Sequence, residues 1–167
     1  MIVRHKINSR IQQDETDIKI LDILQREGRA RNSEIAQIVG LSLPSVGERL
    51  KKMEDSGVIT GYYAKLDHRK FGKDVTAFVS VNIDSSRHFA AFVEHADALE
   101  EIQECHAITG NGTHLLKIRA QNTRQLEKLL AKIRAWQGVV SILTNIVLST
   151  SKESTRIRIH ANGECIE

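Results

Sequence analysis

Aromatic side chains, proline and cysteine are all scarce in this chain of 167 residues. Phe, Trp and Tyr make up only 4% of the sequence, so we expect no platform of aromatic rings for stacking the bases of a single strand. Because proline occurs once, a proline-rich linker is excluded. The two cysteines are far apart and lack the spacing of zinc ligands, which favours a reducing compartment over disulfides or structural zinc.

Long apolar runs are also missing. The longest uncharged run, residues 135–151, contains Gln, Ser, Thr and Asn and is too polar for a membrane span. The first residues lack the apolar segment of a signal peptide, so we expect a cytoplasmic protein with no membrane partner. The net charge is only +3, and any affinity for a polyanion therefore depends on where the cations lie.

The chain does contain a short helix with two unlike faces, at residues 42–57. Ser42 is a suitable N-cap, Pro44 fits the first turn, and Gly57 can end the helix. One face is a narrow apolar stripe of Val46, Leu50 and Met53. The other face carries Ser45, Glu48, Arg49, Lys51 and Lys52. A helix of this kind can be held by a core on one side and lie in a DNA major groove on the other.

The residues before this helix complete a motif. Residues 32–39 predict a shorter helix that begins at Asn32, and the turn at Gly40 has the length and glycine content of a helix-turn-helix. We expect Ile35, Ile38 and Val39 of this helix to face inward. Residues 14–27 predict a preceding helix, and the β-branched and aromatic residues at 58–66 predict a short hairpin, the wing of a winged helix-turn-helix.

The second half follows a different pattern. Strands are predicted at residues 75–83, 99–108, 115–120 and 139–149, with a possible fifth at 155–160, and helices after Ser85 or Ser86 and after Asn122 or Thr123. This order predicts an α+β protein whose second domain is a ferredoxin-like βαββαβ unit. The expected domains are a winged helix-turn-helix at 14–66, a linker at 67–74 and the ferredoxin-like domain at 75–160. We expect its uncovered sheet face to form a dimer.

Double-stranded DNA is the partner that the first domain predicts. Cations meet phosphates, short polar groups and Arg reach base edges, Glu accepts from cytosine, and the N–H groups opening a helix suit a phosphate. The predicted DNA-binding residues are Ser33, Leu43, Pro44, Ser45, Glu48, Arg49, Lys51 and Lys52.

An enzyme is the weakest hypothesis for this sequence. Cys105 and His106 are neighbours in a strand and point to opposite faces, and His88 and His95 are two helical turns apart, so we predict no catalytic residues, no metal site and no cofactor. The alternative to DNA binding is a metabolite-binding regulatory module whose winged helix serves protein contacts. Such a module has little need for the polar and basic residues that share the helix at 42–57.

Taken together, the sequence resembles the leucine-responsive regulatory protein (Lrp)/AsnC family, the feast/famine transcriptional regulators. The resemblance spans about residues 14–149 and rests on segments 17–21, 28–29, 40–42, 57–62, 101–106, 109–110, 115–117 and 138–139 with Val46, Arg49, Leu50 and Glu54 between them. It implies an N-terminal DNA-binding winged helix and a C-terminal domain for ligand sensing and oligomerisation. It also implies dimers that assemble into octamers or similar rings, and an amino acid or another small metabolite as effector between dimers.

The resemblance places the effector near the loop after the strand that holds Cys105 and His106. The residues concerned are His106, Thr109, Gly110, Asn111, Gly112, Thr113 and His114. The loop departs from the usual Gly-Asp-x-Asp pattern of the family, because both acidic positions are neutral, as Asn111 and Thr113. A carboxylate to pair with an α-ammonium is therefore absent. Binding of another metabolite, weak binding of an amino acid through backbone groups and loss of sensing remain open.

Overall fold

The computed structural model describes residues 13–159, which form two compact units. The first unit holds the described residues up to Lys65 together with those from Ser154 onward, and the second unit is Leu66–Glu153. The chain thus passes from one unit to the other twice. We expected residues 154–159 in the ferredoxin-like domain, whereas their contacts group them with the first unit.

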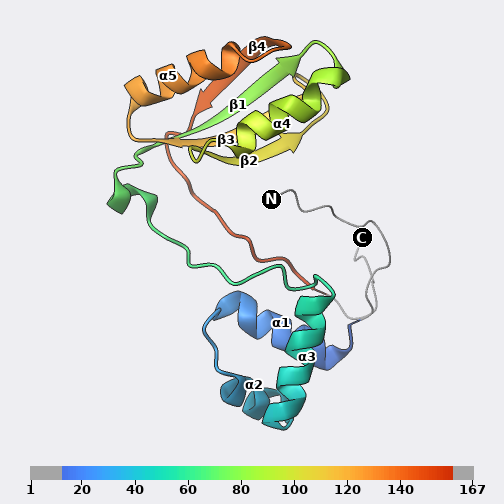
Figure 1. The fold of residues 1–167 in the computed structure, drawn as a ribbon. Coiled ribbons are helices and arrows are strands. Elements are labelled where there is room, and N and C mark those ends of the chain that lie inside the picture. The colour runs from blue at the N-terminus through green and yellow to red at the C-terminus, as the bar shows by residue number, and fades with distance from the viewer. Residues whose placement is uncertain (1–12, 160–167) are drawn as a thin grey trace. The chain divides into compact units, whose positions relative to one another are not determined.

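Local sequence signals set the helices of the first unit. These are α1 (Glu15–Arg26), α2 (Asn32–Val39) and α3 (Leu43–Asp55). Ser42 caps α3, since its hydroxyl oxygen accepts a hydrogen bond from the backbone N–H of Ser45 at 3.3 Å. Pro44 lies in the first turn, and Gly57 follows the last turn with φ of 75°. The predicted start and stop of this helix are confirmed (Figure 1).

The core of the first unit lies between the three helices. Its buried hydrophobic residues are Ile20, Leu21, Ile35, Ala36, Val46, Leu50 and Met53. The prediction that Ile38 faces inward is wrong, because its side chain is 67% exposed. A helix of two turns buries only one narrow face, and in α2 that face is formed by Ile35 and Ala36, with Val39 beside them.

The predicted hairpin at 58–66 does not form; the residues between α3 and the short 3-10 helix His68–Phe71 contain no strand. Val58 and Ile59 pack against the helical core, and the Tyr62 hydroxyl donates to Glu54 of α3 at 3.0 Å. A hairpin this short has no third strand to pair with and is marginal in water. The apolar residues at its start therefore add to the core, and the rest runs along the surface.

The second unit contains the predicted ferredoxin-like arrangement. Its strands are β1 (Val75–Ile83), β2 (Ile102–Ala107), β3 (His114–Ala120) and β4 (Val139–Ile146), and its helices are α4 (Phe89–Asp97), preceded by a 3-10 turn at Ser86–His88, and α5 (Thr123–Arg134). The sheet has the order β2-β3-β1-β4 with antiparallel neighbours (Figure 1). Asn122 caps α5 by accepting from the backbone N–H of Gln125 at 2.9 Å.

Both helices cover one face of this sheet. Val79, Val81, Leu116 and Ile118 pack there, and the residues that α4 and α5 add to the same core are Phe92, Ala96, Leu126, Leu129 and Ile133. Residues directly opposite one another in neighbouring strands share a face. The register therefore places Phe78, Ser80, Leu115, Lys117, Leu143 and Asn145 on the other face, which no helix covers. This uncovered face mixes apolar and charged groups.

The possible fifth strand at 155–160 is not present. Residues 155–159 are extended but belong to no sheet, and His160 lies outside the described residues. These residues lie against α1 of the first unit, where Gln25 bonds the backbone of Ile157. Their alternation of Arg and Ile predicted an extended chain correctly, but its partner is a helix.

Candidate nucleic-acid interface and effector site

The exposed face of α3 holds the polar and basic residues that the sequence assigned to DNA. Lys51, Lys52, Glu48 and Pro44 are exposed, and no hydrogen bond or ion pair within the described residues occupies the two lysine ammonium groups. Leu43, in the first turn, is 53% exposed. Because Val46, Leu50 and Met53 anchor the opposite face in the core, these groups are held at the surface with a fixed spacing.

Arg49 does not share this environment. Its Nη1 donates to Asp14 Oδ2 at 2.6 Å and to Asp17 Oδ1 at 2.8 Å, so the guanidinium joins α3 to the start of α1. We expected Arg49 to be a surface cation available to DNA. The structure gives it two carboxylate partners instead, at the edge of the buried face of α3. This role of Arg49 could not be predicted from the local sequence, because its two partners lie 32 and 35 residues away along the chain.

Electrostatics support this arrangement around Arg49. The hydrogen bond that Arg49 donates to Asp17 is the main cause that raises the pKa of the Arg49 guanidinium, followed by the one that it donates to Asp14. The backbone N–H of Asp17 and then Arg49 lower the pKa of the Asp14 carboxyl. Asp14 is also the N-cap of α1, accepting from the Asp17 N–H at 2.8 Å. One carboxylate thus caps α1 and binds α3.

Two helix N-termini complete the candidate interface. The hydroxyl groups of Ser42 and Ser45 are 2.8 Å apart, and Ser45 is half-buried. Ser33, in the first turn of α2, is exposed. The first N–H groups of a helix carry a partial positive charge and bind anionic oxygens well. Ser33, Ser45 and the cations of α3 are therefore chemically suited to phosphates and base edges.

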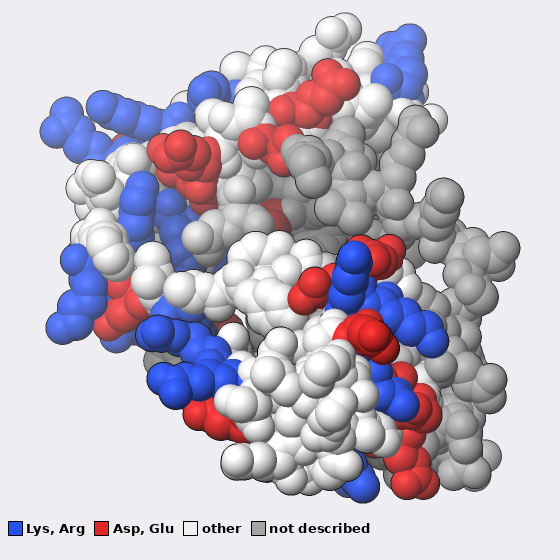
Figure 2. All heavy atoms as spheres, turned by 60° about the horizontal axis from the view of Figure 1, so that its bottom comes forward, with Lys and Arg blue, Asp and Glu red and all other residues white. Residues whose placement is uncertain are grey.

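Positive charge lies in small separate groups on the face that Figure 2 displays. Figure 2 shows separate groups of Lys and Arg side chains interspersed with Asp and Glu groups on the face displayed. This agrees with the small net charge of +3. The face displayed offers no broad basic surface, so affinity for DNA through it depends on cations at specific positions.

The predicted effector residues form the connection from β2 to β3, and the structure divides them into two sets. Thr109, Gly110 and Asn111 are exposed at the tip. Thr113 is tied to β1: its hydroxyl donates to the Val81 carbonyl oxygen and accepts from the backbone N–H of Ile83, both at 3.2 Å. A Cβ on Gly112 would meet the Val81 carbonyl oxygen at 3.1 Å, so this close approach favours glycine.

His114 and His106 lie apart from that tip. His114 is 2% exposed, with its ring 4.8 Å from that of Phe89 and 4.9 Å from that of Phe92, centroid to centroid. Its Nδ1 is 3.1 Å from the Thr113 hydroxyl. His106 is exposed and contacts Glu104 at 3.3 Å. His114 is therefore buried in this chain, unlike the exposed tip of the loop, and its predicted contact with an effector stays a prediction.

We expect His114 to make stability depend on pH. Burial lowers the pKa of its imidazole below the usual 6.5, so the unfolded chain binds the proton more strongly. The free energy of unfolding should be fully maintained above about pH 6.5 and should fall as the pH drops from there toward the lowered pKa. Melting temperatures at about pH 7.5 and about pH 5.5 measure this, and His114→Phe should reduce the difference. If His106→Gln, at an exposed site, reduces it equally, the assignment to His114 is wrong.

Cys105 and His106 form no catalytic pair. Cys105 packs against the core under the helices, where burial raises the pKa of its thiol, and His106 lies on the uncovered sheet face. On that same face Lys117 donates to Glu104 at 3.0 Å. Neither residue has the geometry of a nucleophile next to its base.

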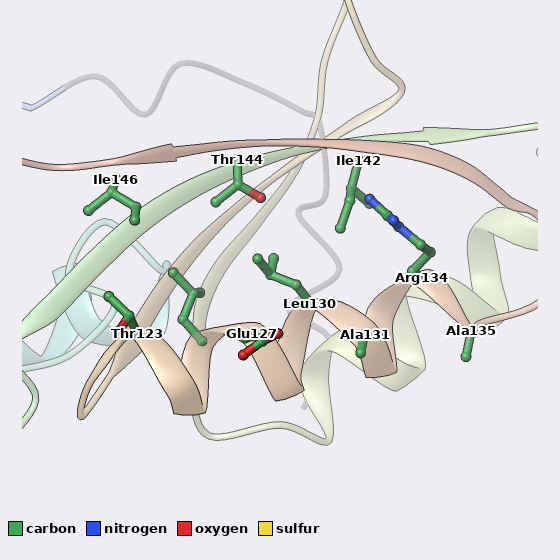
Figure 3. A pocket seen from close by; sticks show the side chains of 10 residues that line it. Thr123, Glu127, Leu130, Ala131, Arg134, Ala135, Ile142, Thr144 and Ile146 are labelled. Carbon is green, nitrogen blue, oxygen red and sulfur yellow. The ribbon is translucent and has the colours of Figure 1, made fainter.

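A separate groove of about 760 Å³ lies between α5 and the edge strand β4. Its lining residues are Thr123, Leu126, Glu127, Leu130, Ala131, Arg134, Ala135, Ile142, Thr144 and Ile146. Figure 3 shows Ile142, Thr144 and Ile146 pointing from β4 toward α5, where Leu130 and Arg134 extend toward the strand. The groove is mainly apolar because α5 does not cover the whole helix-facing side of β4. None of the predicted effector residues lines it.

Residues 13–159 offer neither a metal site nor a transmembrane helix. No group of His, Cys, Asp or Glu side chains in that range is arranged to hold a metal ion. No helix among them is both long and apolar enough to cross a bilayer.

Each of the two units is similar to a known protein domain family. The Lrp/AsnC ligand binding domain matches residues 76–157, and a winged helix-turn-helix DNA-binding domain matches residues 13–60. The second match extends over all three helices and the turn that holds Gly40. Both halves of a DNA-binding regulator are therefore present, which favours that hypothesis over a module acting through protein contacts.

Relatives share both the sequence and the fold. The HTH-type transcriptional regulator YezC of Bacillus subtilis is 42% identical over 117 residues, covering 70% of this chain and 82% of its own. The leucine-responsive regulatory protein of Klebsiella pneumoniae is 34% identical, over 87% of this chain and 91% of its own. The transcriptional regulator NMB0573 of Neisseria meningitidis was solved in complex with L-Met. It is 30% identical with a TM-score of 0.83, and the match covers 88% of this chain and 97% of its own.

Proposed function

Because this chain belongs to the Lrp/AsnC family of DNA-binding transcriptional regulators, we propose that α3 is its recognition helix and reads a specific duplex through the major groove. One observation carries the proposal: α3 is capped, anchored by its apolar stripe, and presents Lys51 and Lys52 with no protein partner among the described residues. In the proposal these lysines bind phosphates, and Ser45 and Glu48 face base edges.

The proposal gives Arg49 an indirect role. Bound to Asp14 and Asp17, it fixes the orientation of α3 against α1 and does not itself reach the duplex. Leu43 and Pro44, both exposed in the first turn, suit apolar contact with a thymine methyl group. Ser33 and the N-terminus of α2 suit a phosphate beside the groove.

Selection from randomised duplexes tests this function. We expect enrichment of a two-fold symmetric site with half-sites about one helical turn, roughly 34 Å, or a multiple of it apart. Enrichment requires only the protein and a DNA library, so it does not depend on knowing the effector. Failure to enrich any sequence, with binding that is equal for all duplexes, would refute sequence-specific regulation.

We propose a dimer as the unit that binds such a site. The uncovered face of the sheet carries Phe78, Leu115 and Leu143, and Leu143 is 58% exposed. Apolar groups on an otherwise uncovered face favour association with a second copy. Assembly of dimers into an octamer or a similar ring follows the family, and native mass spectrometry reports the number of chains directly.

An amino acid is the proposed effector. The similar regulator from Neisseria meningitidis was solved as an L-Met complex, which supports a small apolar amino acid for this chain. In the proposal the exposed tip, Thr109 to Asn111, contacts the ligand. The side chain of Thr113 is engaged by β1 and contributes little. DNA binding places the protein with the chromosome, so a cytoplasmic location also belongs to this proposal.

Asn111→Asp should strengthen binding of a free amino acid. A carboxylate at this exposed position can form a charge-assisted hydrogen bond to the α-ammonium group, worth roughly a tenfold gain in affinity. Titration calorimetry with L-methionine and the other amino acids measures it. Thr113→Asp is the matched control, because it breaks the bonds to β1 and should lower stability without a gain in affinity. Equal affinities of Asn111→Asp and the unmodified chain would exclude Asn111 from the site.

A further inference from the structure

The last described residues, 154–159, lie against α1, the first helix of the chain, and belong to the same compact unit. The backbone N–H of Ile157 donates to Gln25 Oε1 at 2.7 Å, and Gln25 Nε2 donates to the Ile157 carbonyl oxygen at 3.2 Å. A single amide side chain thus satisfies both polar groups of one residue, as a neighbouring strand would do.

Two further contacts flank this pair. Arg156 Nη2 lies 2.6 Å from Asp22 Oδ1, and the other Asp22 oxygen binds Arg26 at 2.7 Å. Ile159 is half-buried and packs against the core of the first unit. Ile157 and Arg158 point outward and are exposed. The segment therefore binds through the Arg156 side chain, the Ile157 backbone and the Ile159 side chain.

The residue before this segment is anchored in the other unit. Glu153 Oε1 accepts hydrogen bonds from Lys117 Nζ at 2.9 Å and from Arg119 Nη2 at 3.2 Å, on the uncovered sheet face. Only two residues separate Glu153 from Arg156. Glu153 is therefore bonded to the second unit, and Arg156 and Ile157 are bonded to α1.

We propose that residues 154–159 form a strap that belongs to the DNA-binding unit and docks on α1 of its own chain. Docked, the strap stabilises α1, and α1 holds the recognition helix through the hydrogen bonds that Arg49 donates to Asp14 and Asp17. A change at the sheet face that shifts Glu153 can then reach α3 through the strap and α1. This inference goes beyond the proposed function and does not require that the protein bind DNA.

Chain continuity is the reason that the occupant is the same chain. Within one chain the strap and α1 are joined covalently through the second unit, so their docking is intramolecular and independent of protein concentration, whereas docking on a second copy weakens as the protein is diluted. The ion pair to Asp22 also requires the Arg156 side chain, whereas the reciprocal bonds to Gln25 use only the backbone of Ile157.

Hydrogen exchange of the full chain without DNA tests the strap. Gln25→Ala removes two hydrogen bonds and should speed exchange of the α1 amides about tenfold, and Arg156→Ala, which removes a solvent-exposed ion pair, about threefold. The matched controls are Gln37→Ala in α2 and Arg158→Ala in the strap, both at exposed positions. The proposal is overturned if Gln25→Ala and Arg156→Ala leave the exchange rates of the α1 amides unchanged. It is also overturned if the two control variants raise these rates equally.

Mixing experiments separate docking within a chain from docking between chains. The Arg156→Ala chain has an intact α1 site, and the Gln25→Ala chain has an intact strap. If the strap acts within its own chain, mixing the two variants leaves α1 of the Arg156→Ala chain poorly protected. Recovery of its protection in the mixture would show exchange of straps between copies and would contradict the proposal.

Discussion

The double variant Lys51→Ala/Lys52→Ala is expected to bind its specific duplex roughly ten- to a hundredfold more weakly at physiological salt, while its fold is unchanged. Both ammonium groups lie on the exposed face of α3, away from Val46, Leu50 and Met53. Each lysine at a phosphate releases condensed counterions from the duplex. Removing two such contacts should reduce the slope of log affinity against log salt by about 1.8 for each bound chain. Fluorescence anisotropy titrations at several salt concentrations measure both quantities.

A second pair of lysines supplies the control. Lys128→Ala/Lys132→Ala removes the same charge from exposed positions of α5, in the other unit. General electrostatic attraction would be lost equally in the two double variants, whereas contacts of α3 would be lost only in the first. An equal reduction of the salt slope in both would remove Lys51 and Lys52 from the interface.

Arg49→Ala is expected to lower the free energy of unfolding of the first unit by about 1–2 kcal/mol. The side chain of Arg49 is 34% exposed, so solvent screens the ion pairs and the effect stays below that of a fully buried pair. Part of the loss comes from Asp17, which is 8% exposed and would retain a buried carboxylate with no guanidinium beside it. Urea denaturation followed by circular dichroism measures it.

The comparison with Lys52→Ala makes this prediction specific. Lys52 lies on the same helix and is exposed, so its loss should leave stability unchanged and weaken DNA binding. Arg49→Ala should instead reduce stability, and its loss of affinity for DNA should be the indirect result of a less firmly held α3. If Arg49→Ala keeps its stability and loses affinity for DNA as Lys52→Ala does, Arg49 contacts the duplex directly.

Local signals explain why much of the fold could be predicted from the sequence. Ser42 and Asn122 cap helices by bonding an N–H three residues away, and this depends on nothing else in the chain. Apolar and polar residues alternate from Val75 to Ile83, and this period of two predicts a strand with one face covered by the core. The ferredoxin-like order then follows from the sequence of elements.

Tertiary partners explain what could not be predicted. The role of Arg49 depends on Asp14 and Asp17, and the position of residues 155–159 depends on Gln25, 132 residues away from Ile157. An Arg in an exposed helix and an alternating Arg-Ile segment have the same local pattern whether or not such partners exist. Ile38 was misplaced for the same reason, since its exposure follows from how α2 packs.

The candidate sites were predictable to different degrees. Lys51, Lys52 and Glu48 lie on the exposed face because helical periodicity alone sets them opposite the apolar stripe. In the effector loop, periodicity carries no information, and the inward position of His114 depends on Phe89 and Phe92 of another helix. Family resemblance locates the loop but does not say which of its side chains are free.

The most direct test of the central claim, that α3 lies in the major groove of its site, is cleavage of DNA from a probe on the helix itself. An iron chelate attached to Glu48→Cys, in a chain with Cys105→Ala and Cys165→Ala, should cut the selected duplex inside the region that the protein protects. The same chelate at Lys128→Cys on α5 should not. Cutting from position 128 with none from position 48 would contradict the account.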